Sequence, residues 1–214
     1  MRCGIAESVE TQSKIGAVIL AAGASTRMGR PKQLLLHGGR TLVRCAVETA
    51  LASVCHPVVV VIGAHAGPVR TELEHLPVLV AENREWATGM SSSIRSGLET
   101  LVATGASLEG VVIMLCDQPF ITAGVINELV EAHRRTGKSI VASQYREVRG
   151  VPALFSIELL AEIATLRANE GARQVIASHA DDVTAVSFAE GIVDVDTPRD
   201  YELLEAMTPR FSAI

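Results

Sequence analysis

The chain has 214 residues, of which 48% are hydrophobic and 20% charged, so it can bury a substantial core and is not disordered over most of its length. Its net charge of −5 and its few aromatics (4 Phe, 2 Tyr and 1 Trp) argue against nucleic acid as the main partner. The longest apolar runs, VVVVIGA and VVIMLC, are too short to span a membrane.

Apolar runs of strand length alternate with amphipathic stretches of helix length along the chain. Strands are predicted at Ala17–Leu20, Val58–Ile62, Val78–Ala81, Val111–Leu115, Ile140–Ser143, Ala153–Phe155, Val183–Ser187 and Ile192–Val195. Helices are predicted at Thr41–Ala52, Gly67–Glu74, Ser92–Ala103, Ala123–Thr136, Ile157–Thr165, Gly171–Ser178 and Pro198–Ala206. This order predicts an α/β fold, a Rossmann-like three-layer sandwich around a mainly parallel sheet. Closely spaced strands after Ile140 predict a short antiparallel element, at a sheet edge or in a small substrate lobe.

The domain prediction is a single unit over 14–207, with flexible tails at 1–13 and 208–214. The first tail is polar and has no apolar signal core, so no export is expected. The four cysteines, Cys3, Cys45, Cys55 and Cys116, form no CxxC pair and no zinc-like cluster with histidine. We therefore expect reduced, mostly buried thiols in a cytoplasmic protein.

Ligands of such sheets bind beyond the carboxyl ends of the strands, where this chain has AAGASTRMGRPKQ, CDQPF and DVDTPRD. In the first segment, Gly23 and Gly29 permit a tight anion-binding loop, and Arg27 and Lys32 supply positive charge for phosphate oxygens. The spacing is not that of a P-loop, and the chain contains no GxGxxG. A plain turn with two solvated cations is the alternative, but the position after the first strand favours a nucleoside triphosphate site.

Three aspartates stand at the other two segments. Asp117 follows the run VVIMLC, while Asp194 and Asp196 lie at the end of GIVDV, which is predicted as a strand. Carboxylates at neighbouring strand ends would converge on one rim, where Mg²⁺ takes one or two carboxylates together with phosphate oxygens. Taken singly, Asp196 is equally well explained as a helix N-cap and Asp117 as a turn former.

The order of motifs resembles a known enzyme family. LAAGASTRMGRPK is similar to the LAAGxSxRMGxxK signature of nucleotidyltransferases, and the resemblance continues through NREWATGMSSSIRSGLETL, CDQPF, GVPALF, NEGARQVI and DVDTPRD. It covers nearly everything from Lys14 to Glu205. The ordered set is most similar to the MobA-like nucleotidyltransferases, and within them to the molybdenum-cofactor cytidylyltransferase branch.

The resemblance implies transfer of CMP from CTP to a phosphorylated acceptor, molybdopterin, with Mg²⁺ as cofactor, pyrophosphate as product and a molybdoenzyme as a possible recipient. Catalytic roles are implied for Arg27, Lys32 and Asp117. Nucleotide contacts are implied for Leu20, Ala21, Ala22, Gly23, Ser25, Arg27, Lys32, Gly89 and Ser93. Metal ligation is implied for Asp117 and Asp196. Acceptor contacts are implied for Gly150, Pro152, Arg173 and Asp194.

Some of these positions have equally good structural explanations. Gly89 and Ser93 belong to a Ser-rich segment that can simply cap a helix, and Arg173 can be an exposed helical cation. Trp86 can be a lid residue or a packing residue. The chain also departs from the branch pattern, with Val151 in place of the His of GHP and Asn169-Glu170 in place of Gly-Asp. Both departures lie on the acceptor side.

Three rival functions follow. The acceptor can instead be a sugar, polyol or phospholactate phosphate. The chain can be a molybdenum-cofactor-binding chaperone without catalysis, although the presence of both Asp117 and Asp196 argues against a damaged metal site. An NAD(P)-binding domain is the third rival, and it lacks its glycine motif here. No histidine is assigned a catalytic role.

Overall fold

The computed structural model describes residues 14–168 and 170–207, so the predicted tails and Cys3 lie outside the described residues. The strands are β1 (Lys14–Ala21), β2 (Leu36–His37), β3 (Arg40–Thr41), β4 (Val58–Ile62), β5 (Leu79–Glu82), β6 (Leu108–Leu115), β7 (Ile140–Tyr145), β8 (Val148–Ser156) and β9 (Val183–Ser187). The helices are α1 (Leu42–Leu51), α2 (Ala66–Glu72), α3 (Met90–Val102), α4 (Ala123–Thr136), α5 (Leu160–Ala164), α6 (Ala172–Ser178) and α7 (Pro198–Met207). Each predicted helix has a counterpart, within a few residues at its ends.

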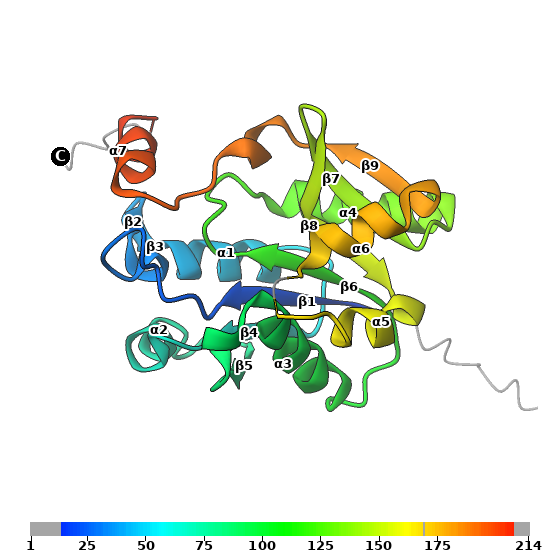
Figure 1. The fold of residues 1–214 in the computed structure, drawn as a ribbon, viewed down its shortest axis with the longest axis horizontal. Coiled ribbons are helices and arrows are strands. Elements are labelled where there is room, and N and C mark those ends of the chain that lie inside the picture. The colour runs from blue at the N-terminus through cyan, green and yellow to red at the C-terminus, as the bar shows by residue number, and fades with distance from the viewer. Residues whose placement is uncertain (1–13, 169, 208–214) are drawn as a thin grey trace, which may run out of the picture.

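Seven strands form one sheet in the order β5-β4-β1-β6-β8-β7-β9 (Figure 1). All neighbours in it are parallel except that β8 runs antiparallel to both β6 and β7. The chain proceeds from β1 outward to β4 and β5 and then returns to the other side of β1 with β6. This reversal creates a switch point between β1 and β6, which is where ligands bind in Rossmann-like sheets.

Strand alternation explains why the sheet is covered on both faces. In β1, Ala17 and Ile19 face one hydrophobic cluster, whereas Val18 and Leu20 face the other, and both sets are almost fully buried. A strand buried on both sides must be apolar at successive positions, which is the pattern that the sequence shows. Helices α1, α2 and α4 pack on the first face, and α3, α5 and α6 pack on the second. The predicted α/β, Rossmann-like three-layer sandwich is confirmed.

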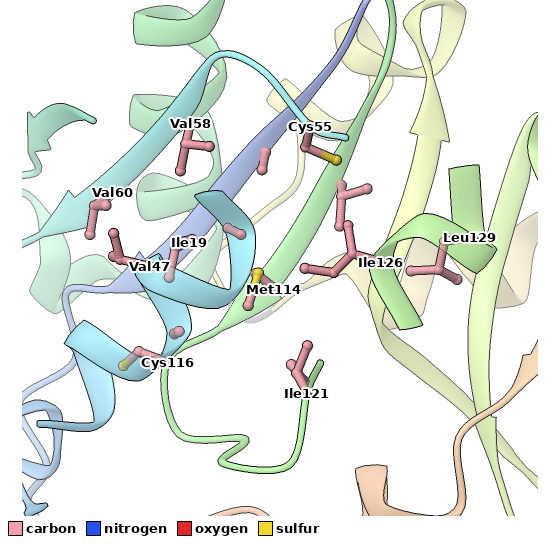
Figure 2. Packing of buried hydrophobic residues seen from close by; sticks show 14 of the residues in the cluster. Ile19, Val47, Cys55, Val58, Val60, Met114, Cys116, Ile121, Ile126 and Leu129 are labelled. Carbon is pink, nitrogen blue, oxygen red and sulfur yellow. The ribbon is translucent and has the colours of Figure 1, made fainter. Parts of the chain in front are cut away.

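Figure 2 shows the first of these faces. Val47 on α1 and Ile126 on α4 point toward Ile19 and Met114 on the central strands.

Helix α4 is capped at both ends. The Thr122 hydroxyl accepts from the Val125 backbone N–H at 3.3 Å, and Gly137, in the left-handed conformation, ends the last turn.

Three details differ from the sequence-based prediction. The antiparallel strand β8 is not at an edge but inside the sheet, because its seven residues from Gly150 to Ser156 are all buried. A small hairpin, β2–β3, was not predicted; it turns at Gly38 and Gly39, whose φ angles of 57° and 81° fit the two-residue turn of a hairpin. Ile192–Val195 is not a strand, since a 3₁₀ turn covers Ala189–Ile192 and β9 already pairs with β7.

A third cluster joins the C-terminal helix to the first loop. Helix α7 lies beside β2 and β3 at one end of the molecule (Figure 1). The cluster consists of Met28, Leu35, Leu42, Val195, Tyr201 and Leu204. Val195 is fully buried there, which explains why this apolar residue does not extend the sheet. Among the described residues, no helix combines the length and apolarity needed to cross a membrane.

The fit between α3 and the sheet gives a stability prediction. A Cβ atom at Gly97 would lie 2.5 Å from Val18 Cγ1 and 2.9 Å from Val61 Cγ2, both on buried strands. We expect Gly97→Ala to lower the free energy of unfolding by about 1–3 kcal/mol through overpacking, in spite of alanine's better helix propensity. Urea denaturation followed by circular dichroism measures the change.

The matched control is Gly124→Ala on α4, where the nearest atom to the new Cβ is Thr122 Oγ1 at 3.5 Å. This variant should be neutral or more stable by up to about 1 kcal/mol, because the added methyl meets no tight contact and the helix gains propensity. Equal effects of the two substitutions would contradict the proposed packing of α3.

Candidate active site

The first loop is held from inside by a buried amide. Gln33, which is 1% exposed, donates through Nε2 to the carbonyl oxygens of Ala21 and Gly23 at 3.1 and 2.7 Å. Its Oε1 accepts from the hydroxyl of Ser25 at 3.2 Å. These bonds turn two loop carbonyls toward the protein interior. The backbone N–H groups of Gly23, Ala24 and Ser25 have no acceptor among the described residues, which is the arrangement that suits an anion.

Ser25 closes this loop rather than opening it to a ligand. Its φ of 55° is in the left-handed region, and its carbonyl accepts from the N–H groups of Met28 and Gly29 at 3.0 and 3.1 Å. Its hydroxyl also accepts from the backbone N–H of Lys32 at 3.0 Å. The loop shape is therefore coupled directly to the start of the 3₁₀ turn Lys32–Leu34, and with it to the position of the Lys32 side chain.

The Lys32 ammonium lies between two carboxylates from distant parts of the chain. Nζ contacts Asp117 Oδ2 directly and donates to Asp196 Oδ1 at 2.7 Å. The more exposed Arg27 donates through Nη2 to the other oxygen of Asp196 at 2.9 Å. Burial by itself would lower the pKa of Lys32, but the charge of Asp117 and the hydrogen bonds to both carboxylates outweigh it and raise that pKa. Lys32 is therefore a permanent cation.

Apolar neighbours bring these charges together. Val195 donates its backbone N–H to the carbonyl of Asp117 at 3.0 Å and buries its side chain in the same cluster as Met28. Since Asp196 follows Val195 and Arg27 precedes Met28, packing of the two apolar residues places the two charges side by side. The predicted convergence of the aspartates is thus present, although the strand expected before Asp196 is not.

Neither aspartate has the purely structural role, helix N-cap or turn former, that its local sequence also allows. Asp196 is not the N-cap of α7, because Thr197 Oγ1 accepts from the Asp200 N–H at 3.3 Å while Asp200 Oδ2 accepts from the Thr197 N–H at 2.8 Å. This reciprocal pair is a capping box. Asp117 does not use its side chain to close a turn either. Its Oδ2 contacts Lys32, and its Oδ1 is shielded from solvent without any hydrogen-bond partner among the described residues.

Two adjoining cavities meet at Lys32 and Asp117. The smaller one, of about 240 Å³, we call the base pocket, and the larger one, of about 650 Å³, the acceptor pocket. Among the predicted site residues, the base pocket is lined by Leu20, Ala21, Ala22, Gly23, Lys32, Gly89, Ser93 and Asp117. The acceptor pocket is lined by Leu20, Arg27, Lys32, Gly89, Asp117, Arg173, Asp194 and Asp196. The predicted residues Ser25, Gly150 and Pro152 line neither cavity.

The far wall of the acceptor pocket is built on buried polar contacts. Gln118 donates through Nε2 to the Val151 carbonyl at 3.2 Å and to Asp194 Oδ1 at 3.0 Å, while its own Oε1 is buried without a partner among the described residues. Burial, and then the charge of Asp117, raise the pKa of Asp194. Arg173 donates through Nη2 to the Tyr145 hydroxyl at 2.6 Å, so it is not a free helical cation.

Gly150 and Pro152 contribute to this wall from behind. A Cβ at Gly150 would lie 2.2 Å from the Tyr145 hydroxyl oxygen and 3.2 Å from Arg173 Nε, so only glycine leaves room for that pair. Pro152 is buried in β8, where its carbonyl accepts from the Ser143 hydroxyl at 2.6 Å. Both residues support the acceptor pocket without facing it.

Three amide residues and one aromatic residue also lie at the site, although none of them was assigned to it from the sequence. Gln33 holds the first loop, Gln118 supports the acceptor pocket, and Asn83 follows β5 at the same sheet edge as Asp117. Trp86 lines the base pocket and is 37% exposed. The position of Asn83 at a strand end was a usable sequence signal, whereas Gln33 sits in a 3₁₀ turn and carries no such signal. Cys116 also lines the base pocket, but burial raises the pKa of its thiol to about 12.

Comparison with known proteins gives consistent matches. The MobA-like NTP transferase domain matches residues 17–183. The purine catabolism protein PucB of Bacillus subtilis (strain 168) is 31% identical over 202 residues, covering 87% of this chain and 94% of PucB. The nicotine blue oxidoreductase of Paenarthrobacter nicotinovorans is 39% identical over 121 residues, a match to 56% of this chain and only 57% of that relative's length. The manganese complex of Rv0371C from Mycobacterium tuberculosis H37Rv is 25% identical, has a TM-score of 0.73 and covers 92% of this chain and 100% of that chain.

The bridging position of Lys32 yields a metal-binding prediction. In a Lys32→Met variant, Asp117 and Asp196 lose the cation that neutralises both of them. We expect this variant to bind Mn²⁺ without nucleotide about tenfold more tightly than the wild type, because a nearby unit charge near a protein surface changes ion binding by at least this much. Calorimetric titration measures the affinity.

Lys138→Met is the matched control, because Lys138 pairs at 3.6 Å with Asp182 in an exposed ion pair away from the cavities. It should leave Mn²⁺ binding unchanged. Equal or weaker Mn²⁺ binding by the Lys32→Met variant would show that the two carboxylates do not act as a cation site.

Proposed function

Because the chain belongs to the family of MobA-like NTP transferase domains, we propose that it transfers CMP from CTP to a phosphorylated small-molecule acceptor, molybdopterin, and releases pyrophosphate. The observation that carries the proposal is the pair of cavities that meet at Lys32 and Asp117. A nucleotidyl transfer needs two anionic substrates side by side at one reacting phosphorus atom. Two adjoining cavities with one cation, Lys32, at their common wall suit that requirement.

The base pocket and the first loop would take the nucleotide. The unpaired N–H groups of Gly23, Ala24 and Ser25 can donate to phosphate oxygens, and Arg27 and Lys32 add positive charge. The base pocket is the smaller cavity, and the buried methyl group of Ala22 takes up part of its wall. This supports a pyrimidine over the larger purine, and so CTP over GTP.

The carboxylates fit a Mg²⁺ ion that arrives with its nucleotide. Among the described residues, no cluster of three or more metal-binding side chains exists, so a dedicated all-protein cage is absent. Mg²⁺ typically takes one or two carboxylates and completes its shell with phosphate oxygens and water. The unpartnered Asp117 Oδ1 supplies a free oxygen ligand, and Asp196 is its neighbour across Lys32. Asp117 and Asp196 would hold the ion, which supplies charge neutralisation at the phosphates.

The residues of this chain would act mainly by electrostatics. The acceptor phosphate is already anionic, so its oxygen can attack the α-phosphorus of CTP without a general base, while pyrophosphate leaves on the opposite side. The difficulty is repulsion between the two anions and the charge that builds on the leaving group. Lys32, a permanent cation at the wall shared by both cavities, and Arg27 at the mouth of the acceptor pocket are placed to neutralise that charge.

The choice of molybdopterin rests on the acceptor-side motifs rather than on the nucleotide side. Arg173 and Asp194 line a cavity of about 650 Å³, which is large enough for a bulky cofactor and offers both a cation and a carboxylate. The manganese complex of Rv0371C supports a divalent ion in this fold. Val151 and Glu170, two of the positions that depart from the branch pattern, line this cavity, so the test must vary the acceptor.

A panel of nucleotides and acceptors tests the assignment. We expect CTP with Mg²⁺ to raise the melting temperature more than GTP or UTP, because a ligand that binds only the native state stabilises it by mass action. Pyrophosphate release should then require both CTP and molybdopterin. Release with a sugar, polyol or phospholactate phosphate instead would retain the enzyme and replace its acceptor, while pterin binding without turnover would indicate a carrier.

Removing one carboxylate tests the mechanism. We expect Asp117→Asn to lower the rate of pyrophosphate release roughly 100–1000-fold, the size typical for a preorganised electrostatic contact of the transition state. Asp182→Asn, which changes a half-buried aspartate at the opposite end of the sheet, is the control and should retain full activity. An unchanged rate in the Asp117 variant would refute the role of that carboxylate.

A further inference from the structure

A buried asparagine beside Ser92 and Ser93 has a fixed orientation. Asn83 directly follows β5 and is 5% exposed. Its Oδ1 accepts from the backbone N–H of Glu85 at 2.9 Å, and since a backbone N–H can only donate, the amide oxygen must face that way. The Nδ2 group therefore faces Ser92 Oγ at 2.9 Å and Ser93 Oγ at 3.0 Å, and it donates to both hydroxyls.

The hydroxyl hydrogens of Ser92 and Ser93 differ in whether the protein offers them an acceptor. A hydroxyl has one hydrogen to donate and two lone pairs to accept with. Ser92 can give its hydrogen to the carbonyl of Gly89 at 2.8 Å or of Glu85 at 3.1 Å. Ser93 accepts from Asn83 but finds no acceptor for its own hydrogen anywhere in residues 14–168 and 170–207. Of the two, Ser93 is the one that lines the base pocket.

We propose that Asn83 is a positioning residue that keeps Ser93 as a hydrogen-bond donor toward the base pocket, and that the pocket thereby selects cytosine through its ring nitrogen N3. The inference rests on the proposed function, because it concerns the nucleotide of that reaction. Cytosine N3 carries a lone pair, whereas uracil carries an N–H at the same ring position. Ser93 could accept from the uracil N–H with its second lone pair only by turning its own hydrogen away from the pocket, where the described residues offer that hydrogen no acceptor. The donor at this point therefore favours cytosine over uracil. On this proposal, the Ala22 wall of the pocket favours pyrimidines over purines, and Ser93 separates the two pyrimidines.

The variant Asn83→Asp reverses the proposed polarity. A carboxylate can only accept, so Asp at this position keeps the Glu85 N–H but draws the Ser93 hydrogen toward itself and leaves a lone pair facing the pocket. We expect the ratio of the UTP and CTP dissociation constants, measured by calorimetry with Mg²⁺ and no acceptor, to fall by about tenfold or more. The control is Asn127→Asp on α4, where the Oδ1 atom accepts from the Val54 N–H at 2.9 Å and the carboxylate can do the same. Its ratio should equal that of the wild type.

A double-mutant cycle separates positioning from mere structural damage. Ser93→Ala removes the donor and should lower the CTP preference by roughly fivefold to tenfold, the value of one hydrogen bond. If Asn83 acts through Ser93, adding Asn83→Asp to Ser93→Ala should not change the ratio of the UTP and CTP dissociation constants further. A ratio that shifts equally in both backgrounds would overturn the proposal.

The remaining outcomes are also decisive. If the Asn83→Asp chain does not fold, Ser93→Ala alone decides, and an unchanged CTP preference in it contradicts the donor role. Wild-type protein that binds neither CTP nor UTP would instead contradict the proposed function itself. Wild-type protein that binds both equally, and transfers either nucleotide to an acceptor, would leave that function standing and refute only the selection by Ser93.

Discussion

The site depends on one ammonium group held between two carboxylates. Asp117 and Asp196 are 79 positions apart in sequence, and they would repel each other if nothing lay between them. Lys32 satisfies both, and its side chain is only 16% exposed, so water screens these attractions weakly. Removing one member of such a group leaves an uncompensated charge at low exposure, which is far more costly than the loss of a surface ion pair. The spacing of the two carboxylates, and the wall shared by both cavities, are therefore set by Lys32.

Apolar packing, rather than the charges themselves, brings this group together. Met28 and Val195 are buried in one cluster with residues of α1 and α7, and each is the direct neighbour of a charged residue of the site. Ion pairs formed over so long a loop could not offset the entropy of closing it, whereas burial of large side chains can. The hairpin β2–β3 and helix α7 thus help to position the charged group, although neither contributes a residue to the two cavities. A sequence with the right aspartate but a polar residue in place of Val195 would lose the site.

The sequence predicts a segment well where its own pattern determines its burial, and poorly where contacts with distant segments determine it. Strands such as Val58–Ile62 are apolar at every position and have only one stable location, so the sheet and its covering helices were predictable. Ile192–Val195 contains three β-branched residues around Asp194 but forms no strand. Val195 is instead buried against residues of the first loop and of α7, and no local pattern reveals that contact. The convergence of Asp117 and Asp196 was predicted correctly from a partly wrong premise. Two neighbouring strand ends would have placed the aspartates at one edge of the sheet. The backbone hydrogen bond from Val195 to Asp117 places them at that same edge without a second strand.

If Asp117 and Asp196 hold the metal as proposed, the bridging geometry implies that metal and nucleotide cannot bind independently. On the proposed assignment, a divalent ion that arrives alone meets an ammonium between its two ligands, and a triphosphate that arrives alone meets two carboxylates. Each partner removes the obstacle for the other, because Lys32 can turn to the phosphates only when another cation replaces it at Asp117 and Asp196. A ligand shifts an equilibrium only through its different affinity for the two states, and here each ligand favours the same displaced state of Lys32. Such coupling is reciprocal by thermodynamic necessity, so the metal must strengthen nucleotide binding by the factor by which the nucleotide strengthens metal binding.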